Sequence, residues 1–199
     1  MRFRTVEELV ALGLLEPKPP DPTRVGRWLE RSRTDHALAA DVLARIDRDR
    51  AMAVAYEAGY RACAGLVVLA GYRVTSQPGH HRAAIEGAGS LLGPSARPLL
   101  RRLDAARRFR NETLYGDAPP APEGELRQLL EDVGALLDRL AGAVSGPAPG
   151  AALCTARCLR SRGRRGSRAC SNDDRVCSPD DRRDDGSNHG RRRSLDRLP

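Results

Sequence analysis

The residues best suited to chemistry lie in one stretch, residues 107–117, which reads Arg-Arg-Phe-Arg-Asn-Glu-Thr-Leu-Tyr-Gly-Asp. Arginine offers a rigid fork of donors to phosphate, asparagine can hydrogen-bond a base or sugar, and tyrosine can stack or hydrogen-bond. On a helix, Arg107, Asn111 and Tyr115 would share one face because they are spaced four residues apart. The stretch is therefore a candidate site for a nucleotide or an RNA backbone, with Arg107, Arg110 and Asn111 contacting phosphate.

The same residues also fit an ordinary helix end. The arginines would then form a solvated face, Asn111 would be a polar residue near the helix terminus, and Tyr115 would cover the end of the fold. Short patterns of this kind recur by chance. The motif needs support from the elements that position it.

The apolar pattern predicts helices throughout residues 1–144. Thr5 can cap a short first helix, and the prolines from Pro17 to Pro22 prevent its continuation. Apolar residues then recur near a period of 3.6, and Ser95 is placed to cap the helix that carries the motif. No segment shows the two-residue alternation of a strand. The predicted helices after the first cover residues 24–46, 47–71, 80–92, 95–116 and 123–144.

These helices predict an all-α fold, an up-and-down bundle of four to five helices. Within the third predicted helix, Ala51, Ala55, Ala58 and Ala62 lie close together, where small side chains allow another helix to approach. That helix should be the central one. The predicted organisation is a short helix with a Pro-rich linker over residues 1–23, the bundle over 24–144, and a tail over 145–199.

The positive charge of the chain lies mainly in the tail. Residues 151–199 hold 13 Arg and 7 Asp, a net of +6 out of +8, which leaves +2 for residues 1–150. The tail has no apolar period and should be disordered, because it cannot bury enough apolar surface. Two interpretations stay open: a polybasic arm for nucleic acid, or an out-of-frame extension of a GC-rich gene.

Cysteine usage and the N-terminal sequence predict no metal, no cofactor and a cytoplasmic protein. Cys154, Cys158, Cys170 and Cys177 only loosely resemble a four-thiolate zinc site, because zinc sites use closer pairs of ligands. Cys63 lies on the apolar face of a predicted helix and should be a core residue. Acidic residues follow the basic N-terminus, so we expect no secretory signal, and we expect no membrane association.

The order of motifs along residues 24–144 resembles the HEPN superfamily, a group of helical bundles in bacterial toxin–antitoxin and defence systems. The features that carry the resemblance follow one another in this order: a long helix with Asp49, Ala55-Tyr56, Ala58 and Arg61; the turn Gly71-Tyr72-Arg73-Val74-Thr75 with His80-His81; and a helix ending Arg-Asn-x-x-x-Tyr-Gly-Asp at residues 110–117.

The resemblance implies a ribonuclease-like site at a homodimer interface. Active HEPN ribonucleases typically combine an Arg, often followed by Asn, with a His four to six residues after the Arg. Arg110 and Asn111 match the first two positions, but Tyr115 stands where a histidine is expected. A phenol with an ordinary pKa near 10 is a poor base at neutral pH. Metal-independent RNA cleavage would then be weak or absent, unless His80 or His81 supplies the base.

The leading hypothesis is a HEPN-like protein of an RNA-targeting toxin–antitoxin or defence system that binds RNA or a nucleotide and is a degenerate ribonuclease. Its rival is a non-catalytic interaction module that pairs with itself or with a nucleotidyltransferase, a frequent partner in that family. A helical protein of unrelated role is the third possibility. Ribonuclease and partner-binding measurements would separate them.

Overall fold

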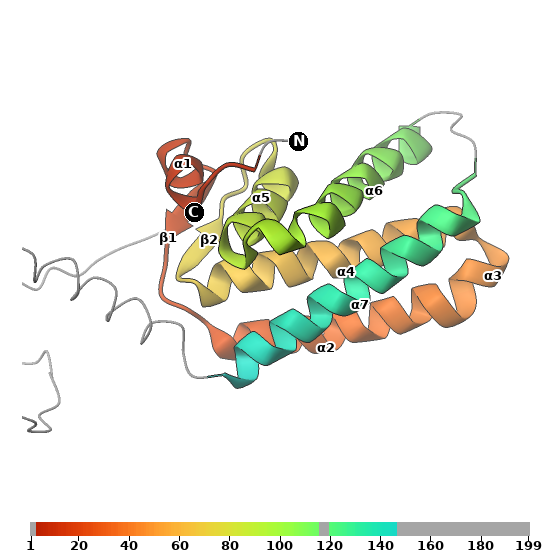
Figure 1. The fold of residues 1–199 in the computed structure, drawn as a ribbon, viewed down its shortest axis with the longest axis horizontal. Helices are drawn as coiled ribbons and strands as arrows, with labels where there is room; N and C mark the ends of the chain where they lie inside the picture. The colour runs from red at the N-terminus through yellow and green to blue at the C-terminus, as the bar shows by residue number, and fades with distance from the viewer. Residues whose placement is uncertain (1–2, 116–119, 147–199) are drawn as a thin grey trace, which may run out of the picture. The chain divides into compact units, whose positions relative to one another are not determined.

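The computed structural model describes residues 3–115 and 120–146, without the side chains of residues 113–115. Within these residues 79% of the chain is helical and 4% is strand, so the predicted all-α bundle is confirmed (Figure 1). The predicted tail begins at residue 145, but α7 includes Ser145; residues 147–199, with the four cysteines and Arg clusters, lie outside the described residues. The elements are α1 Val6–Ala11, β1 Leu15–Pro17, α2 Pro22–Leu38, η1 Ala39–Leu43, α3 Ala44–Ile46, α4 Arg48–Leu69, β2 Tyr72–Val74, α5 His80–Leu92, η2 Pro94–Ala96, α6 Arg97–Tyr115 and α7 Glu123–Ser145.

Helix α4 is the centre of the bundle, as its alanine-rich face predicts. Helices α2 and α7 run below it in Figure 1, and α5 and α6 lie above it. Ala51, Ala55, Ala58 and Ala62 are all fully buried. Because their side chains are small, the neighbouring helices come close to the α4 backbone. Helix α4 is long and apolar enough to cross a membrane, but 72% of its apolar window is buried in the bundle, the pattern of a core helix of a soluble protein.

The apolar period predicts one regular helix before α4. The structure instead has three consecutive helical segments there. Asp21 caps α2 by accepting a hydrogen bond from the backbone of Arg24, and Pro22 occupies the first turn. A π-helical turn then occupies Ala39–Leu43 before the short α3. One extra residue in a turn leaves apolar spacing close to 3.6, so the sequence pattern does not reveal it.

The N-terminal segment forms a short ladder that the sequence does not predict. Thr5 and Glu8 make the expected capping box at α1. The expectation that no strand exists is wrong, because β1 pairs antiparallel with β2 in the register Leu15↔Val74 and Pro17↔Tyr72. Strands of three residues are too short to show alternation. The ladder holds the Pro-rich segment against the end of α4.

The entry to α6 also differs from the prediction. Ser95 does not cap α6, because Pro94–Ala96 forms a 3₁₀ turn and α6 begins at Arg97. Just before α7, the backbone N–H of Ala121 donates a hydrogen bond to Oδ1 of Asp49 at 2.7 Å. This bond fixes the start of α7 to the start of α4.

Candidate functional site

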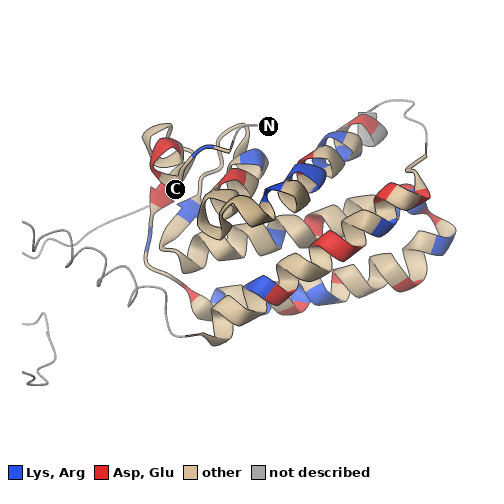
Figure 2. Cartoon of the chain, in the orientation of Figure 1, with Lys and Arg blue, Asp and Glu red and all other residues tan. Residues whose placement is uncertain are grey.

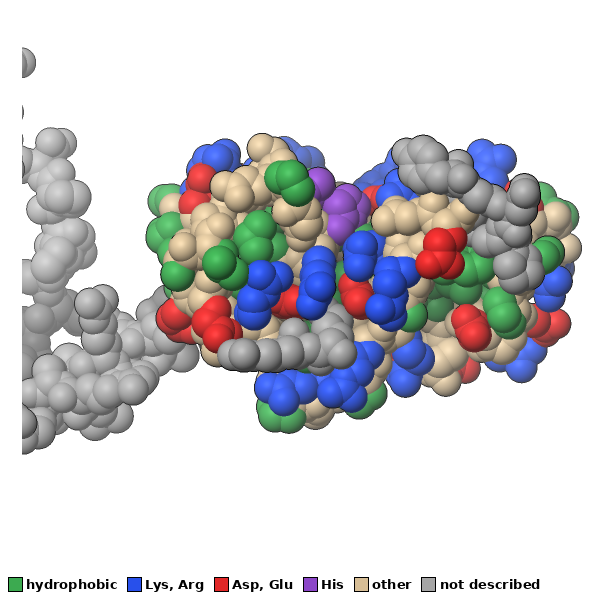
Figure 3. All heavy atoms as spheres, turned by 90° about the horizontal axis from the view of Figure 1, so that it is seen from above, with side chains coloured by type: hydrophobic (Ala, Val, Ile, Leu, Met, Phe, Trp, Pro, Cys, Tyr) green, Lys and Arg blue, Asp and Glu red, His purple; other side chains and the backbone are tan. Residues whose placement is uncertain are grey.

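Three helices bring ring and guanidinium side chains together on one side of the bundle. Figure 3 shows histidine side chains at the surface beside a group of Lys and Arg side chains, in a view from above Figure 1. We call this group the His81 cluster. It consists of Tyr56, Glu57 and Tyr60 from α4, His80 and His81 from α5, and Arg107 and Arg110 from α6.

His81 is held in place by two tyrosines of α4. The Tyr56 hydroxyl lies 2.6 Å from His81 Nδ1, and the Tyr60 ring stacks on the imidazole with 4.0 Å between ring centroids. Tyr56 and Tyr60 lie one turn apart on α4, so both can reach the first turn of α5. Gly79, with a φ of 88°, turns the chain into α5 at this point.

The Tyr56 contact determines which nitrogen of His81 carries the hydrogen. Burial, followed by the charge of Glu57, raises the pKa of Tyr56 above its ordinary value, so the phenol keeps its proton. Nδ1 of His81 is the hydrogen-bond partner that the described residues offer this buried hydroxyl. Tyr56 therefore donates and Nδ1 accepts, which leaves the hydrogen of the neutral imidazole on Nε2.

The imidazole of His81 is neutral at physiological pH. Burial, and to a smaller extent the neighbouring His80, Arg110 and Arg107, together lower its pKa to about 4. Desolvation disfavours the charged ring, and neighbouring cations repel it. His81 is therefore a hydrogen-bond donor through Nε2 and a weak base, whereas efficient proton abstraction near pH 7 needs a group with a pKa near 7.

This depressed pKa predicts a pH-dependent stability. The folded state binds fewer protons than the unfolded state between about pH 6.5 and about pH 4, so the contribution of His81 is lost as the pH falls through that range. Because the ring is half-exposed, we expect a loss of about 1 to 2 kcal/mol rather than the full value of the shift. The measurement is urea unfolding of the wild type and His81→Gln at several pH values. The stability difference between them should change with pH; a constant difference would contradict the assignment.

The two arginines of the cluster already have carboxylate partners. Arg110 Nη2 lies 3.1 Å from Glu57 Oε1, and its guanidinium lies over the Tyr56 ring at 5.8 Å. Arg107 Nε donates to Asp104 Oδ1 at 2.9 Å. The Arg110 and Glu57 side chains are about 30% exposed, and exposed pairs of this kind contribute little free energy. The pair with Glu57 therefore holds Arg110 only weakly.

Helix α6 adds positive charge around the cluster. It carries six arginines against two acidic residues, Asp104 and Glu112, and Figure 2 shows basic positions along the length of this helix. Arg101 and Arg108 are exposed and seven residues apart, so they lie on one face. In the described part of the chain neither has an ion-pair partner. The helix is therefore a basic ridge within a nearly neutral domain.

The structure groups the predicted site residues differently from the helical spacing of four. Arg107 and Arg110 are three residues apart, and the positive charges of both lower the pKa of His81. The sequence offers His81 only as a possible base. His80 lies beside His81 and contacts the carbonyl of Gln77 at 3.1 Å. Asn111 is exposed on α6 and makes no hydrogen bond to the cluster within the described residues. The side chain of Tyr115 lies outside them.

Sequence reasoning missed Tyr56, Glu57 and Tyr60 as parts of the site. Tyr56 and Tyr60 are spaced four residues apart on an alanine-rich helix, and this pair of rings was the available signal. Glu57 gave none, because one acid on a long helix has no distinctive pattern. The side chains of residues 3–112 and 120–146 form no group of three His, Cys, Asp or Glu that could hold a metal ion. Cys63 is fully buried in the core, as predicted, and burial raises its pKa to about 12.

We found no match to this chain among protein-family models, curated proteins or solved structures.

Proposed function

We propose that the bundle binds RNA through its phosphate backbone at the His81 cluster and the basic ridge of α6. The observation that supports it is that Tyr56 contacts residues of two other helices: its hydroxyl lies 2.6 Å from His81 Nδ1 of α5, and the guanidinium of Arg110 of α6 lies over its ring at 5.8 Å. In this proposal the chain is a HEPN-like, cytoplasmic protein of an RNA-targeting toxin–antitoxin or defence system.

The contacts of the cluster indicate how a phosphate would be held. Arg110 would exchange the Glu57 carboxylate for a phosphate oxygen, and its guanidinium can make the two parallel hydrogen bonds that phosphate accepts. The Nε2 hydrogen of His81 supplies a neutral donor beside it. Arg101 and Arg108 add sequence-independent attraction along α6. Such contacts fix an RNA strand in place without reading its bases.

The same contacts support binding over cleavage. His81 accepts from Tyr56 at Nδ1 and carries its hydrogen at Nε2, so neither nitrogen is prepared to take a proton from a ribose hydroxyl. A degenerate ribonuclease fits this arrangement better than an active one. The homodimer implied by the resemblance belongs to the same proposal, whereas pairing with a nucleotidyltransferase without RNA binding belongs to the rival interaction module.

The test is RNA binding by the wild type and Arg110→Ala, measured by fluorescence anisotropy with a labelled single-stranded oligonucleotide. Arg110→Ala should bind about tenfold more weakly, because a charge-assisted hydrogen bond to phosphate is lost. The dependence of log Kd on log salt should decrease by about one phosphate contact. The measurement is made in the full chain and in a chain ending at Gly146, since the tail carries most of the net charge.

The matched control is Arg139→Ala, which removes the same charge from an exposed position on α7. It should bind RNA as the wild type does, apart from a small effect of net charge. Equal affinities of wild type and Arg110→Ala would refute the site. Co-purification of a nucleotidyltransferase together with absent RNA binding would favour the interaction module instead. Rapid cleavage that persists in EDTA and is abolished in His81→Gln would show an active nuclease.

A further inference from the structure

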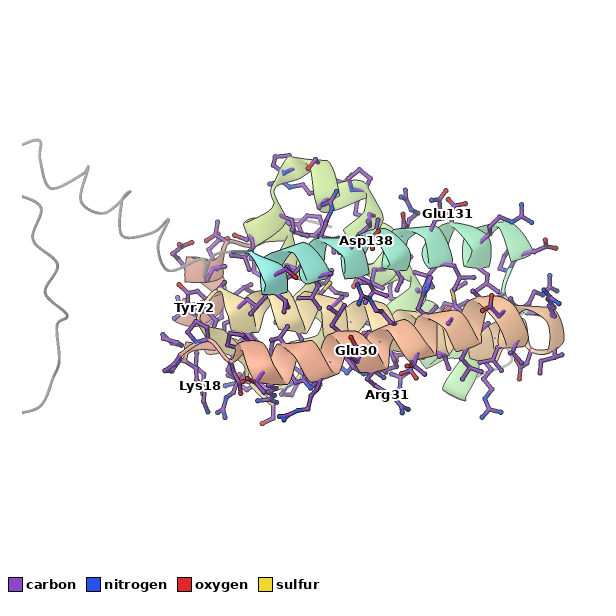
Figure 4. All side chains as sticks on the ribbon, turned by 90° about the horizontal axis from the view of Figure 1, so that it is seen from below. Lys18, Glu30, Arg31, Tyr72, Glu131 and Asp138 are labelled. Carbon is purple, nitrogen blue, oxygen red and sulfur yellow. The ribbon has the colours of Figure 1, made fainter. Side chains whose placement is uncertain are left out.

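A second group of basic and aromatic side chains lies where β1, β2 and the start of α2 meet the end of α4. Two cavities, of about 240 Å³ and about 290 Å³, share Arg24, Val68 and Arg73 in their walls. The first is also lined by Trp28, Tyr60 and Arg61, and the second by Lys18 and Tyr72. Lys18 and Tyr72 lie at one end of the bundle in Figure 4. We call the two cavities together the Arg24 pocket.

The Arg24 guanidinium is oriented by an aromatic ring and not by an anion. It lies over the Trp28 ring at 4.5 Å. A contact with a ring face restrains the guanidinium but leaves the N–H groups along its edge available. Within residues 3–112 and 120–146 no carboxylate pairs with Arg24 or with Lys18. Lys18 and Arg24 are therefore two cations of the pocket without an ion-pair partner, whereas Arg73 is paired with Glu16 at 2.6 Å and the Asp21 carboxylate also lines the second cavity.

Arg61 also lines the first cavity, but it already has a carboxylate partner. Its Nη1 lies 2.8 Å from Asp35 Oδ2, so the protein compensates its charge. Asp35 is also shared with Arg31, so its charge is divided between two guanidinium groups.

We propose that the Arg24 pocket binds a small aromatic ring that carries a phosphate. The ring occupies the cavity lined by Trp28 and Tyr60, where apolar side chains of Ala64 and Val74 complete the wall. The phosphate lies toward Lys18, with Arg24 and Arg73 at the boundary between the cavities. The volumes suit one ring system and one phosphate, either a nucleoside monophosphate or a simpler aryl phosphate.

Backbone hydrogen bonds and prolines keep the pocket formed in the absence of a ligand. Lys18 N–H donates to the carbonyl of Gly71 at 2.9 Å, which extends the β1–β2 pairing to this residue. Asp21 caps α2 and fixes the first turn that carries Arg24. Pro19 and Pro20 line the cavity and limit the freedom of the segment between β1 and α2. A preformed site loses less entropy when it binds.

The experiment uses the fluorescence of Trp28, which is the only tryptophan of the full chain. Phenyl phosphate and adenosine monophosphate are titrated into the intact protein, together with phenol, adenosine and inorganic phosphate. We expect saturable changes with at least one aromatic phosphate, at a Kd of about 1 mM or below. Phenol, adenosine and inorganic phosphate should bind at least about tenfold more weakly. If adenosine monophosphate binds more tightly than phenyl phosphate, the ligand is a nucleotide; the reverse order indicates a simpler aryl phosphate.

Two variants on α2 test the role of Arg24, with calorimetry as the readout because Arg24 also affects the fluorescence of Trp28. Arg24→Gln should weaken binding of the aromatic phosphate about tenfold, whereas Arg27→Gln, which removes an exposed charge from the same helix, should not change it. Arg110→Ala should also bind normally, because Arg110 contacts Glu57 and the Tyr56 ring and lines neither cavity, although Tyr60 belongs to both the pocket and the His81 cluster. Absent binding, equal binding of inorganic phosphate, or equal effects of Arg24→Gln and Arg27→Gln would overturn the proposal.

Discussion

Replacing both Arg4 and Arg82 by methionine is expected to lower the unfolding free energy by about 3 to 5 kcal/mol. The reason is Glu86, a fully buried carboxylate on α5. Arg4 Nε contacts Glu86 Oε2, and Arg82 Nε contacts Glu86 Oε1 at 2.8 Å. Without either guanidinium, the charge of Glu86 remains buried without compensation. Methionine keeps much of the apolar stem of arginine, so the loss reports on charge and not on packing.

The triple variant Arg4→Met, Arg82→Met, Glu86→Met is the control for this prediction. It removes the buried charge together with its partners, and well-packed apolar replacements of buried ion pairs are often as stable as the original. We therefore expect it to recover most of the lost stability in urea unfolding monitored by circular dichroism. A double variant as stable as the wild type, or a triple variant less stable than the double, would contradict the assigned role of Glu86.

The Glu86 contacts show which parts of this fold the sequence can predict. Apolar periodicity located the main helices, and Thr5 and the buried alanines of α4 behave as expected. The pairing of Arg4 with Glu86 joins residues 82 positions apart, and no local pattern reports such a contact. The three-residue strands and the π-helical turn were missed for the same reason, since each depends on tertiary contacts and not on local spacing.

In the candidate site, too, the sequence predicts local features but not the tertiary contacts. Arg107 and Arg110 lie on one helix, α6, as the apolar pattern predicts, because helical periodicity is a local property. The pattern could not show that His81 lies beside them, since that depends on how α5 and α6 pack on α4. Nor could it show that Tyr56 sets the tautomer of His81. The proposed preference for binding over cleavage therefore rests on the tertiary contact between Tyr56 and His81.

Replacing Gly59 by leucine is expected to cost about 3 kcal/mol or more, because three helices meet at this residue. A Cβ atom at Gly59 would lie 2.8 Å from Leu103 Cδ1 of α6 and 3.0 Å from Val133 Cγ2 of α7. Leu103 and Val133 are fully buried, so neither can move into solvent. Larger side chains in a packed core force shifts of the backbone or strained rotamers. Urea unfolding measures the loss.

Gly26 provides the matched control, because it also lies within a helix but has nothing within 4 Å of an added Cβ. Gly26→Ala should stabilise the protein by about 0.5 to 1 kcal/mol through helix propensity alone, whereas Gly59→Ala should not. Adding Leu103→Ala to Gly59→Leu should restore part of the stability, since it removes the side chain that is overpacked. Stabilisation by alanine at both glycines would contradict the proposed close packing.

The contact at Gly59 also links the core to the candidate site. Gly59 lies between Glu57 and Tyr60 on α4, and Leu103 lies one turn before Arg107 on α6. A side chain that separates these helices should therefore move Arg110 away from Glu57 and from the Tyr56 ring. Gly59→Ala, which adds one methyl group, should then weaken RNA binding while the chain remains folded. Gly26→Ala should leave the RNA affinity unchanged. Equal effects of Gly59→Ala and Gly26→Ala on the affinity would show that packing at Gly59 does not position the site.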